Sequence, residues 1–189
     1  MTAIDVVNLA LIELGDRTIN ALSEDNKRAK TMNAIYVGTR DEVLRLCPWT
    51  FARTRLSISA DASNPLWGYG NRYALPADFL YMISVENLED YTIEDGYIHA
   101  NSTSGVADTS LNVKYIKRVT DMSKADSLFV QALAAKLAFK ACDRITQSNT
   151  KKDQLRFDYE QVALEAKRLN GQETTPYFFK EDEWITEMD

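Results

Sequence analysis

The chain has 189 residues, of which 45% are hydrophobic and 26% are charged, and its formal net charge is −6. This composition is typical of one globular domain, or of one domain with a small insertion, so a hydrophobic core can form. No apolar stretch approaches the roughly 20 residues that are needed to cross a bilayer, so we expect no membrane partner.

The negative charge is concentrated at the end of the chain. Residues 172–189 hold six acids and one base, which is −5 of the total of −6 and leaves −1 for the first 171 residues. A nearly neutral body argues against tight DNA binding through a basic face. The acidic segment suits a basic partner surface, or serves solubility alone.

The first predicted element is a helix over residues 3–14. Apolar residues such as Ile4 and Leu11 recur at three- and four-residue spacing, and Gly15 stands where a C-terminal cap is expected. No positively charged segment precedes this helix, and acids interrupt its apolar side. We therefore expect a helix of the mature protein and not a signal peptide.

A second helix is predicted from Ser23, as its N-cap, to about Leu46. It ends before Pro48, because proline lacks the backbone N–H group that a helix interior requires.

The pattern changes to strands and turns between residues 54 and 119. Four segments alternate apolar and polar residues with a β-branched bias, and a stretch rich in Gly, Pro and aromatic residues separates the first two. "EDG" at 94–96 predicts a hairpin turn between "DYTI" and "YIHA". The segments are "TRLSISA", "YMISVEN", "YTIEDGYIHA" and "SLNVKYIKRV".

Helical spacing returns after residue 120. One helix is predicted to start at a cap formed by Asp121 or Ser123, with its apolar stripe running from Phe129 to Ala141. A last long helix is predicted to stop at Gly171. Residues 172–189 have no periodicity, which predicts an extended tail.

The predicted fold class is α+β. Residues 1–50 and 120–171 are expected to form a four-helix bundle of two helical pairs. Residues 51–119 are expected to form an inserted small antiparallel β module, and residues 172–189 an extended, acidic and aromatic C-terminal tail.

We find no sequence pattern that predicts catalysis, and we expect no cofactor and no metal. His99 is the only histidine, so one chain cannot form a histidine pair or a histidine-containing triad. The carboxylates Glu94 and Asp95 lie in a turn without a partner base. Cys47 and Cys142 are expected to be buried, reduced thiols of a protein made in the cytosol.

Four segments occur in a characteristic order: "NLALIELGDRTINAL", "RDEVLRLCPWTFARTRLSI", "GYGNRYALPADFLYMISVEN" and "YIKRVTDMSKADSLFVQALAAKLAFKACDRIT". In this order they resemble the tubular tail protein A family of short-tailed bacteriophages (podoviruses). The resemblance covers residues 3–172, and the chain beyond Pro176 has no match in it.

The resemblance implies a non-enzymatic structural protein of the virion, a head-to-tail connector that is synthesised in the host cytoplasm. Copies of such an adaptor form a ring, a dodecamer in the family. Its helical part faces the portal protein and its β module faces the tail nozzle protein. The genomic DNA passes through the bore, during genome ejection, without sequence-specific binding.

Two other classes of function stay open from the sequence alone. One is a cytosolic nucleic-acid-binding or regulatory helical protein, against which the near-neutral body and the acidic tail count. The other is a small hydrolase, which the missing nucleophile and base disfavour.

Pro48, Trp49 and Phe51 mark the predicted junction between the bundle and the β module. We expect Trp49 and Phe51 to pack in the core there and to fix the two parts together, while Pro48 sets the direction of the chain. The alternative is a contact with another protomer.

Large aromatic residues in the acidic tail predict an interface, because such side chains seldom stay in water without a partner. We expect them to dock on the portal or on a neighbouring protomer, or else to fold back on their own domain. The aromatic residues are Tyr177, Phe178, Phe179 and Trp184, and the apolar Ile185 is grouped with them.

Lys114, Lys117 and Arg118 form a small basic group near the end of the last predicted strand. They are interpreted as a solvated edge that protects an exposed strand, or as a contact with an acidic neighbour or with DNA in the bore. Trp67, Tyr69 and Tyr73, near two glycines, are interpreted as turn packing or as a stacking platform for a sugar or base.

Overall fold

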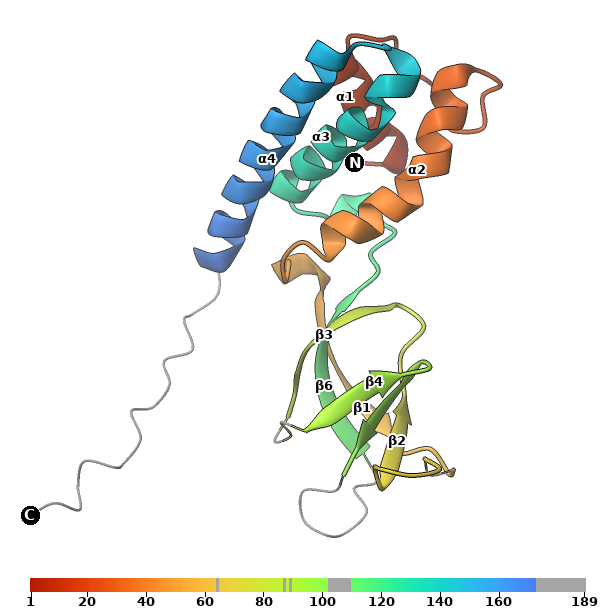
Figure 1. Ribbon diagram of the computed structural model, residues 1–189, viewed down its shortest axis with the longest axis vertical. Coiled ribbons are helices and arrows are strands. Elements are labelled where there is room, and N and C mark those ends of the chain that lie inside the picture. The colour runs from red at the N-terminus through yellow and green to blue at the C-terminus, as the bar shows by residue number, and fades with distance from the viewer. Residues whose placement is uncertain (64, 87, 89, 102–109, 173–189) are drawn as a thin grey trace, which may run out of the picture.

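The structure is a computed structural model, and it describes residues 1–63, 65–86, 88, 90–101 and 110–172. Figure 1 shows the four helices at one end of an elongated molecule and the strands at the other. The helices are α1 (Ala3–Leu14), α2 (Lys27–Leu44), α3 (Ser127–Ile145) and α4 (Asn149–Gln172). The strands are β1 (Arg53–Ser59), β2 (Asn71–Ala74), β3 (Phe79–Val85), β4 (Tyr91–Glu94), β5 (Tyr97–Ala100) and β6 (Ser110–Lys117).

The helices do not form the predicted four-helix bundle. Each of α1, α2 and α4 packs extensively on α3, and these three helices make little contact with one another. The reason lies in the composition of α3, which buries small residues all round its circumference and therefore lets neighbours approach on three sides. Its buried alanines are Ala132, Ala134, Ala135, Ala138 and Ala141.

The strands do not form one small inserted module either. They form two three-stranded antiparallel sheets, with strand orders β1-β6-β3 and β2-β5-β4. The first sheet belongs to two cores at once, because Leu80 and Ile116 pack with the helices while Leu111, Val113 and Tyr115 pack with the second sheet. The protein is thus α+β, but the prediction of a four-helix bundle with an inserted β module is wrong.

The helix starts differ from the predicted ones. The N-cap of α2 is Asn26, whose side chain accepts a hydrogen bond from the backbone N–H of Ala29 at 2.8 Å, and not Ser23. Asp126 caps α3 in the same way. Asp121 instead caps a short 3-10 turn (Met122–Lys124) that precedes α3.

The predicted C-terminal cap of α1 and the predicted hairpin turn are confirmed. Gly15 has φ of 77°, a left-handed conformation, and caps α1. β4 and β5 are joined by Asp95 and Gly96, with φ of 47° and 79°, as a two-residue hairpin turn requires. Gly171, the predicted stop, lies inside the last turn of α4.

Among the described helices, none is both long and apolar enough to cross a membrane.

Candidate functional site

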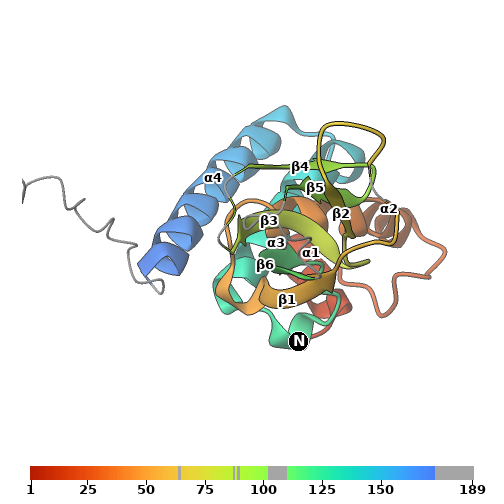
Figure 2. The same ribbon diagram turned by 90° about the horizontal axis from the view of Figure 1, so that it is seen from below.

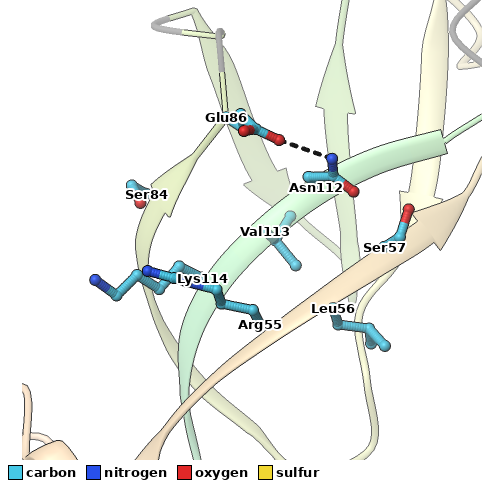
Figure 3. Close-up of a pocket in the computed structure, with 8 residues that line it drawn as sticks. All are labelled: Arg55, Leu56, Ser57, Ser84, Glu86, Asn112, Val113 and Lys114. Carbon is cyan, nitrogen blue, oxygen red and sulfur yellow. Dashed lines mark hydrogen bonds between the residues drawn. The ribbon is translucent and has the colours of Figure 1, made fainter.

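A hollow of about 590 Å³ lies on the outer face of the first sheet (Figure 3). It is open to solvent and is lined by residues from all three strands and by the residue that follows β3. The lining residues are Arg55, Leu56, Ser57, Ser84, Glu86, Asn112, Val113 and Lys114.

The alternation of β-strands explains why this face is polar. In β6, Val113 points into the core between the sheets, so Asn112 and Lys114 point to the opposite face. The antiparallel register then places Arg55 opposite Lys114 and Ser57 opposite Asn112. Along β6 the helices cover the face that carries Asn112 and Lys114 only near the end of the strand, where Ile116 packs in the helical core.

Arg55 and Lys114 bring two positive charges together. They are direct cross-strand partners on the same face of the sheet, and Ser84 flanks Lys114 from β3. Within the described part of the chain, no acidic side chain forms an ion pair with either of them. Like charges directly opposite each other in a sheet are destabilising, so this pair favours an anionic group from outside.

The opposite end of the hollow is held by Glu86 and Asn112. The Asn112 side chain donates a hydrogen bond to the Glu86 carboxylate at 2.7 Å, and the Glu86 backbone N–H donates to the Asn112 carbonyl oxygen at 2.9 Å. Figure 3 shows this pair at one end of the hollow, with Arg55 and Lys114 at the other. The hollow is therefore polarised, with its cationic end free to receive a ligand.

This arrangement can bind an anion. The guanidinium of Arg55 can hold a carboxylate or phosphate through two parallel hydrogen bonds, and Lys114 adds a mobile charge. The hydroxyls of Ser57 and Ser84 can add neutral hydrogen bonds. Across the described residues, no group of three or more His, Cys, Asp or Glu side chains is placed to hold a metal ion.

The three basic residues predicted as one group lie in different surroundings. Lys114 lines the hollow, whereas Lys117 lies on the opposite face at the end of β6. The Arg118 side chain donates a hydrogen bond to the Asp41 carboxylate of α2 at 2.8 Å. Its backbone N–H also donates to the Asp78 carbonyl oxygen at 2.6 Å. Arg118 therefore connects the first sheet to α2.

Trp49 and Phe51 lie where the helices meet the first sheet. Trp49 is 2% exposed, and its indole N–H donates a hydrogen bond to the Val43 carbonyl oxygen at 2.8 Å. Its ring meets that of Phe129 of α3 edge-on, with centroids 5.3 Å apart, and the Phe51 ring lies 5.1 Å from the same phenyl group. This aromatic group joins the chain after α2 to the central helix.

Pro48 is exposed, but its carbonyl oxygen accepts two hydrogen bonds. Arg53 donates to it at 2.9 Å, and Asn170 of α4 donates through its side-chain amide at 3.2 Å. The Asn170 side-chain oxygen also accepts from the backbone N–H of Thr50 at 3.0 Å. Asn170 is a junction residue that the sequence analysis did not identify, because its partners are more than 100 positions away.

The residues of the supposed stacking platform are separated. Tyr73 is 1% exposed in the core between the sheets. The Tyr69 hydroxyl is engaged with Asp90 and Thr92. Leu66 and Trp67, in contrast, are almost fully exposed at 101% and 87% in the loop before β2.

Cys47 and Cys142 are both buried and free. Burial raises the pKa of the Cys47 thiol to about 11, so this thiol stays protonated at neutral pH. His99 lies on β5 next to Tyr97.

The predicted tail contacts of Tyr177, Phe178, Phe179, Trp184 and Ile185 lie outside the described residues.

The sequence also did not point to four polar residues that line the hollow, namely Arg55, Ser57, Ser84 and Asn112. Alternation within each strand does place Arg55 with Ser57, and Asn112 with Lys114. The signal that was missing is the pairing of β1 with β6 over more than 50 intervening residues. Comparison with known protein families and with curated proteins gave no match for this chain.

Proposed function

We propose that the chain is a non-enzymatic head-to-tail adaptor of a short-tailed phage, which joins the portal to the tail nozzle as one subunit of a ring. The proposal starts from the four ordered segments that resemble the tubular tail protein A family. It does not depend on a four-helix bundle. It requires a rigid subunit with separate contact surfaces at its two ends.

The coupling between the two ends of the molecule is the observation that supports this proposal most strongly. Trp49, Asn170 and Arg118 each link the helices to the segments that lead into or out of the first sheet. Ile116 adds a shared apolar contact. A subunit held together in this way can transmit force along its length without hinging, as a joint between a head and a tail requires.

The surfaces at the sheet end also fit contacts with proteins. The cationic end of the hollow suits an acidic group on an adjacent subunit, and the exposed Leu66 and Trp67 suit an apolar recess. An acidic chain, with a net charge of −6, would repel DNA weakly and let it pass without adhesion. Screening limits that repulsion to roughly 8 Å at physiological salt.

Purified heads provide a direct test. A phage whose copy of this gene carries a nonsense mutation should accumulate DNA-filled heads without tails. Added protein should then sediment with these heads and restore tail attachment and infectivity. Shells assembled without the portal are the control and should bind none. Tailed, infectious particles from the nonsense mutant, or equal binding to both kinds of shell, would contradict the proposal.

A further inference from the structure

α4 carries an apolar stripe that the described part of the chain leaves exposed. Phe157 and Leu164 are 60% and 65% exposed. They are seven residues apart and therefore lie on one side of the helix. Leu155 and Ala166, which pack into the helical core, lie on the other side. Large apolar side chains at this spacing are typical of a face that packs on another helix.

α2 carries an exposed face of the opposite shape. Val37 is 56% exposed, and Ala34 and Gly38 beside it are exposed as well. A Cβ atom added at Gly38 would meet no other atom within 4 Å. Small exposed residues at four-residue spacing, with a valine next to them, leave open space on the surface of α2 that can receive large side chains from a neighbouring helix. We call this surface the Ala34–Gly38 patch.

These two faces lie on opposite flanks of the molecule. α3 separates α2 from α4, and both views show α2 and α4 on either side of it (Figures 1 and 2). The C-terminal ends of both helices approach the junction with the sheets, at Trp49 for α2 and at Pro48 for α4. Figure 1 shows the two helices running towards this junction in a similar direction.

The charges beside the two faces are also complementary. Lys27 and Lys30 lie at the N-terminal end of the α2 face, where Lys30 also pairs with Asp25 of its own chain. Asp153 and Glu160 are exposed on the N-terminal half of the α4 stripe. Two adjacent copies related by a simple rotation would place these acids beside the lysines.

We propose that Phe157 and Leu164 of one copy pack on the Ala34–Gly38 patch of the next copy. Two different surfaces on opposite flanks make a head-to-tail contact, and such contacts close into a ring when the rotation between copies allows it. This inference rests on the proposed ring function and assigns the surface through which neighbouring subunits meet.

Cysteine cross-linking tests the contact directly. Ala34→Cys and Phe157→Cys variants are mixed in equal amounts and oxidised, both alone and with the portal ring encoded in the same genome. The native thiols are buried and free, so they give a low background. We expect a covalent dimer that contains one copy of each variant. Ile12→Cys mixed with Phe157→Cys is the control and should give no such dimer, although Ile12 is 61% exposed.

Two substitutions test the energetics without disturbing the fold. Gly38→Leu places a large side chain on the Ala34–Gly38 patch at a position with open space, and leucine favours the helix. Leu164→Ser removes an exposed apolar side chain. Each should weaken assembly by at least roughly tenfold, as the loss of a contact residue at an interface centre does, at an unchanged or higher melting temperature. Ile12→Ser is the matched control and should assemble normally.

The outcomes separate this inference from the proposed function. One outcome is that complete portal-bound assemblies form, that no cross-link appears in them, and that Gly38→Leu and Leu164→Ser assemble normally. This outcome would overturn the α2–α4 contact and leave the adaptor role in place. A protein that assembles under no condition, with or without the portal ring, would overturn both.

Discussion

Asn170, near the end of α4, accepts a hydrogen bond from the backbone N–H of Thr50 at 3.0 Å, across 120 positions of sequence. The same side chain donates to the Pro48 carbonyl oxygen at 3.2 Å. It is one of few buried polar side chains and is 7% exposed. Both of its polar atoms serve the short segment that links α2 to β1, so α4 holds that segment in place.

Substitution Asn170→Ala should lower the free energy of unfolding by about 1–3 kcal/mol, because the Thr50 backbone N–H and the Pro48 carbonyl oxygen each lose one hydrogen bond. Asn170→Asp keeps the acceptor for Thr50 but turns a carboxylate oxygen towards the Pro48 carbonyl oxygen in a nearly buried site, so it should also destabilise the protein. Urea denaturation measures both. Gln161→Ala, at an exposed position of α4, is the control. Equal stabilities for Asn170→Ala and the control would contradict this role.

Trp49→Ala should cost roughly 3–5 kcal/mol of stability, because the indole fills the space between the segment after α2 and α3. Trp67→Ala removes an almost fully exposed indole and should change stability by less than about 0.5 kcal/mol. Thermal unfolding followed by circular dichroism compares the two variants. An unchanged melting temperature for Trp49→Ala would show that the junction does not depend on this residue.

Lys114→Glu should stabilise the isolated protein by about 0.2–1 kcal/mol, because it replaces a like-charge pair with Arg55 by an opposite-charge pair. The gain should shrink as salt is added. Lys117→Glu, on the other face of β6, is the matched control. Urea denaturation at low and high sodium chloride measures the effect. A loss of stability in Lys114→Glu that the control does not share would show that Arg55 and Lys114 do not repel each other.

Alkaline pH should destabilise the protein partly through Tyr115. Burial, together with the hydrogen bond that its hydroxyl donates to Asp78 at 3.0 Å, raises the pKa of Tyr115 from 10.0 to about 12. Between these two pKa values the unfolded chain has lost the phenolic proton and the folded chain keeps it. The free energy of unfolding therefore falls as pH rises through this window, and the contribution of Tyr115 is fully present below pH 10.

Urea denaturation at pH 9 and pH 11, with absorbance at 295 nm to follow phenol ionisation, measures this dependence. Tyr115→Phe should show a smaller loss of stability between the two pH values than the native chain. Asp78→Asn should shift the ionisation of Tyr115 to lower pH, because it removes the nearby negative charge. An identical pH dependence in Tyr115→Phe would rule out this contribution.

Deletion of residues 173–189 should leave the protein folded, because the described residues before Gln172 already build two hydrophobic cores. The deletion should weaken assembly if the tail aromatics dock on the portal or on a neighbouring copy. Circular dichroism measures the fold and sedimentation with phage heads measures binding. An unfolded truncated monomer would instead show that the tail packs on its own domain.

Local chemistry made most of the secondary structure predictable from the sequence. The Asp95–Gly96 turn was predicted because a two-residue hairpin needs residues that tolerate a positive φ. The helix over 3–14 was predicted because its apolar period and Gly15 agree. The N-caps of α2 and α3 were misplaced because several acceptable capping residues stand close together there, and packing decides among them.

The arrangement of the helices was not predictable in the same way. A stripe from Phe129 to Ala141 indicates one packed face of α3. The alanines on its other sides are compatible with burial or with exposure, so the sequence did not reveal that α3 is surrounded. The expected bundle was therefore wrong although each helix was present.

The candidate site shows a similar limit. The alternation in β1 and β6 determines which residues share a face within each strand, and it places Lys114 and Lys117 on opposite faces. The pairing of Arg55 with Lys114 depends on which strands are neighbours and in which register, and that depends on long-range packing. The role of Asn170 has the same origin.

The mass of the assembly tests the central proposal most directly. Native mass spectrometry and light scattering would be applied to the protein alone and to its mixture with the portal ring encoded in the same genome. The proposal predicts a complex with one adaptor chain for each portal subunit. A monomer that persists beside an unoccupied portal ring, at high concentration and at several salt concentrations, would contradict it.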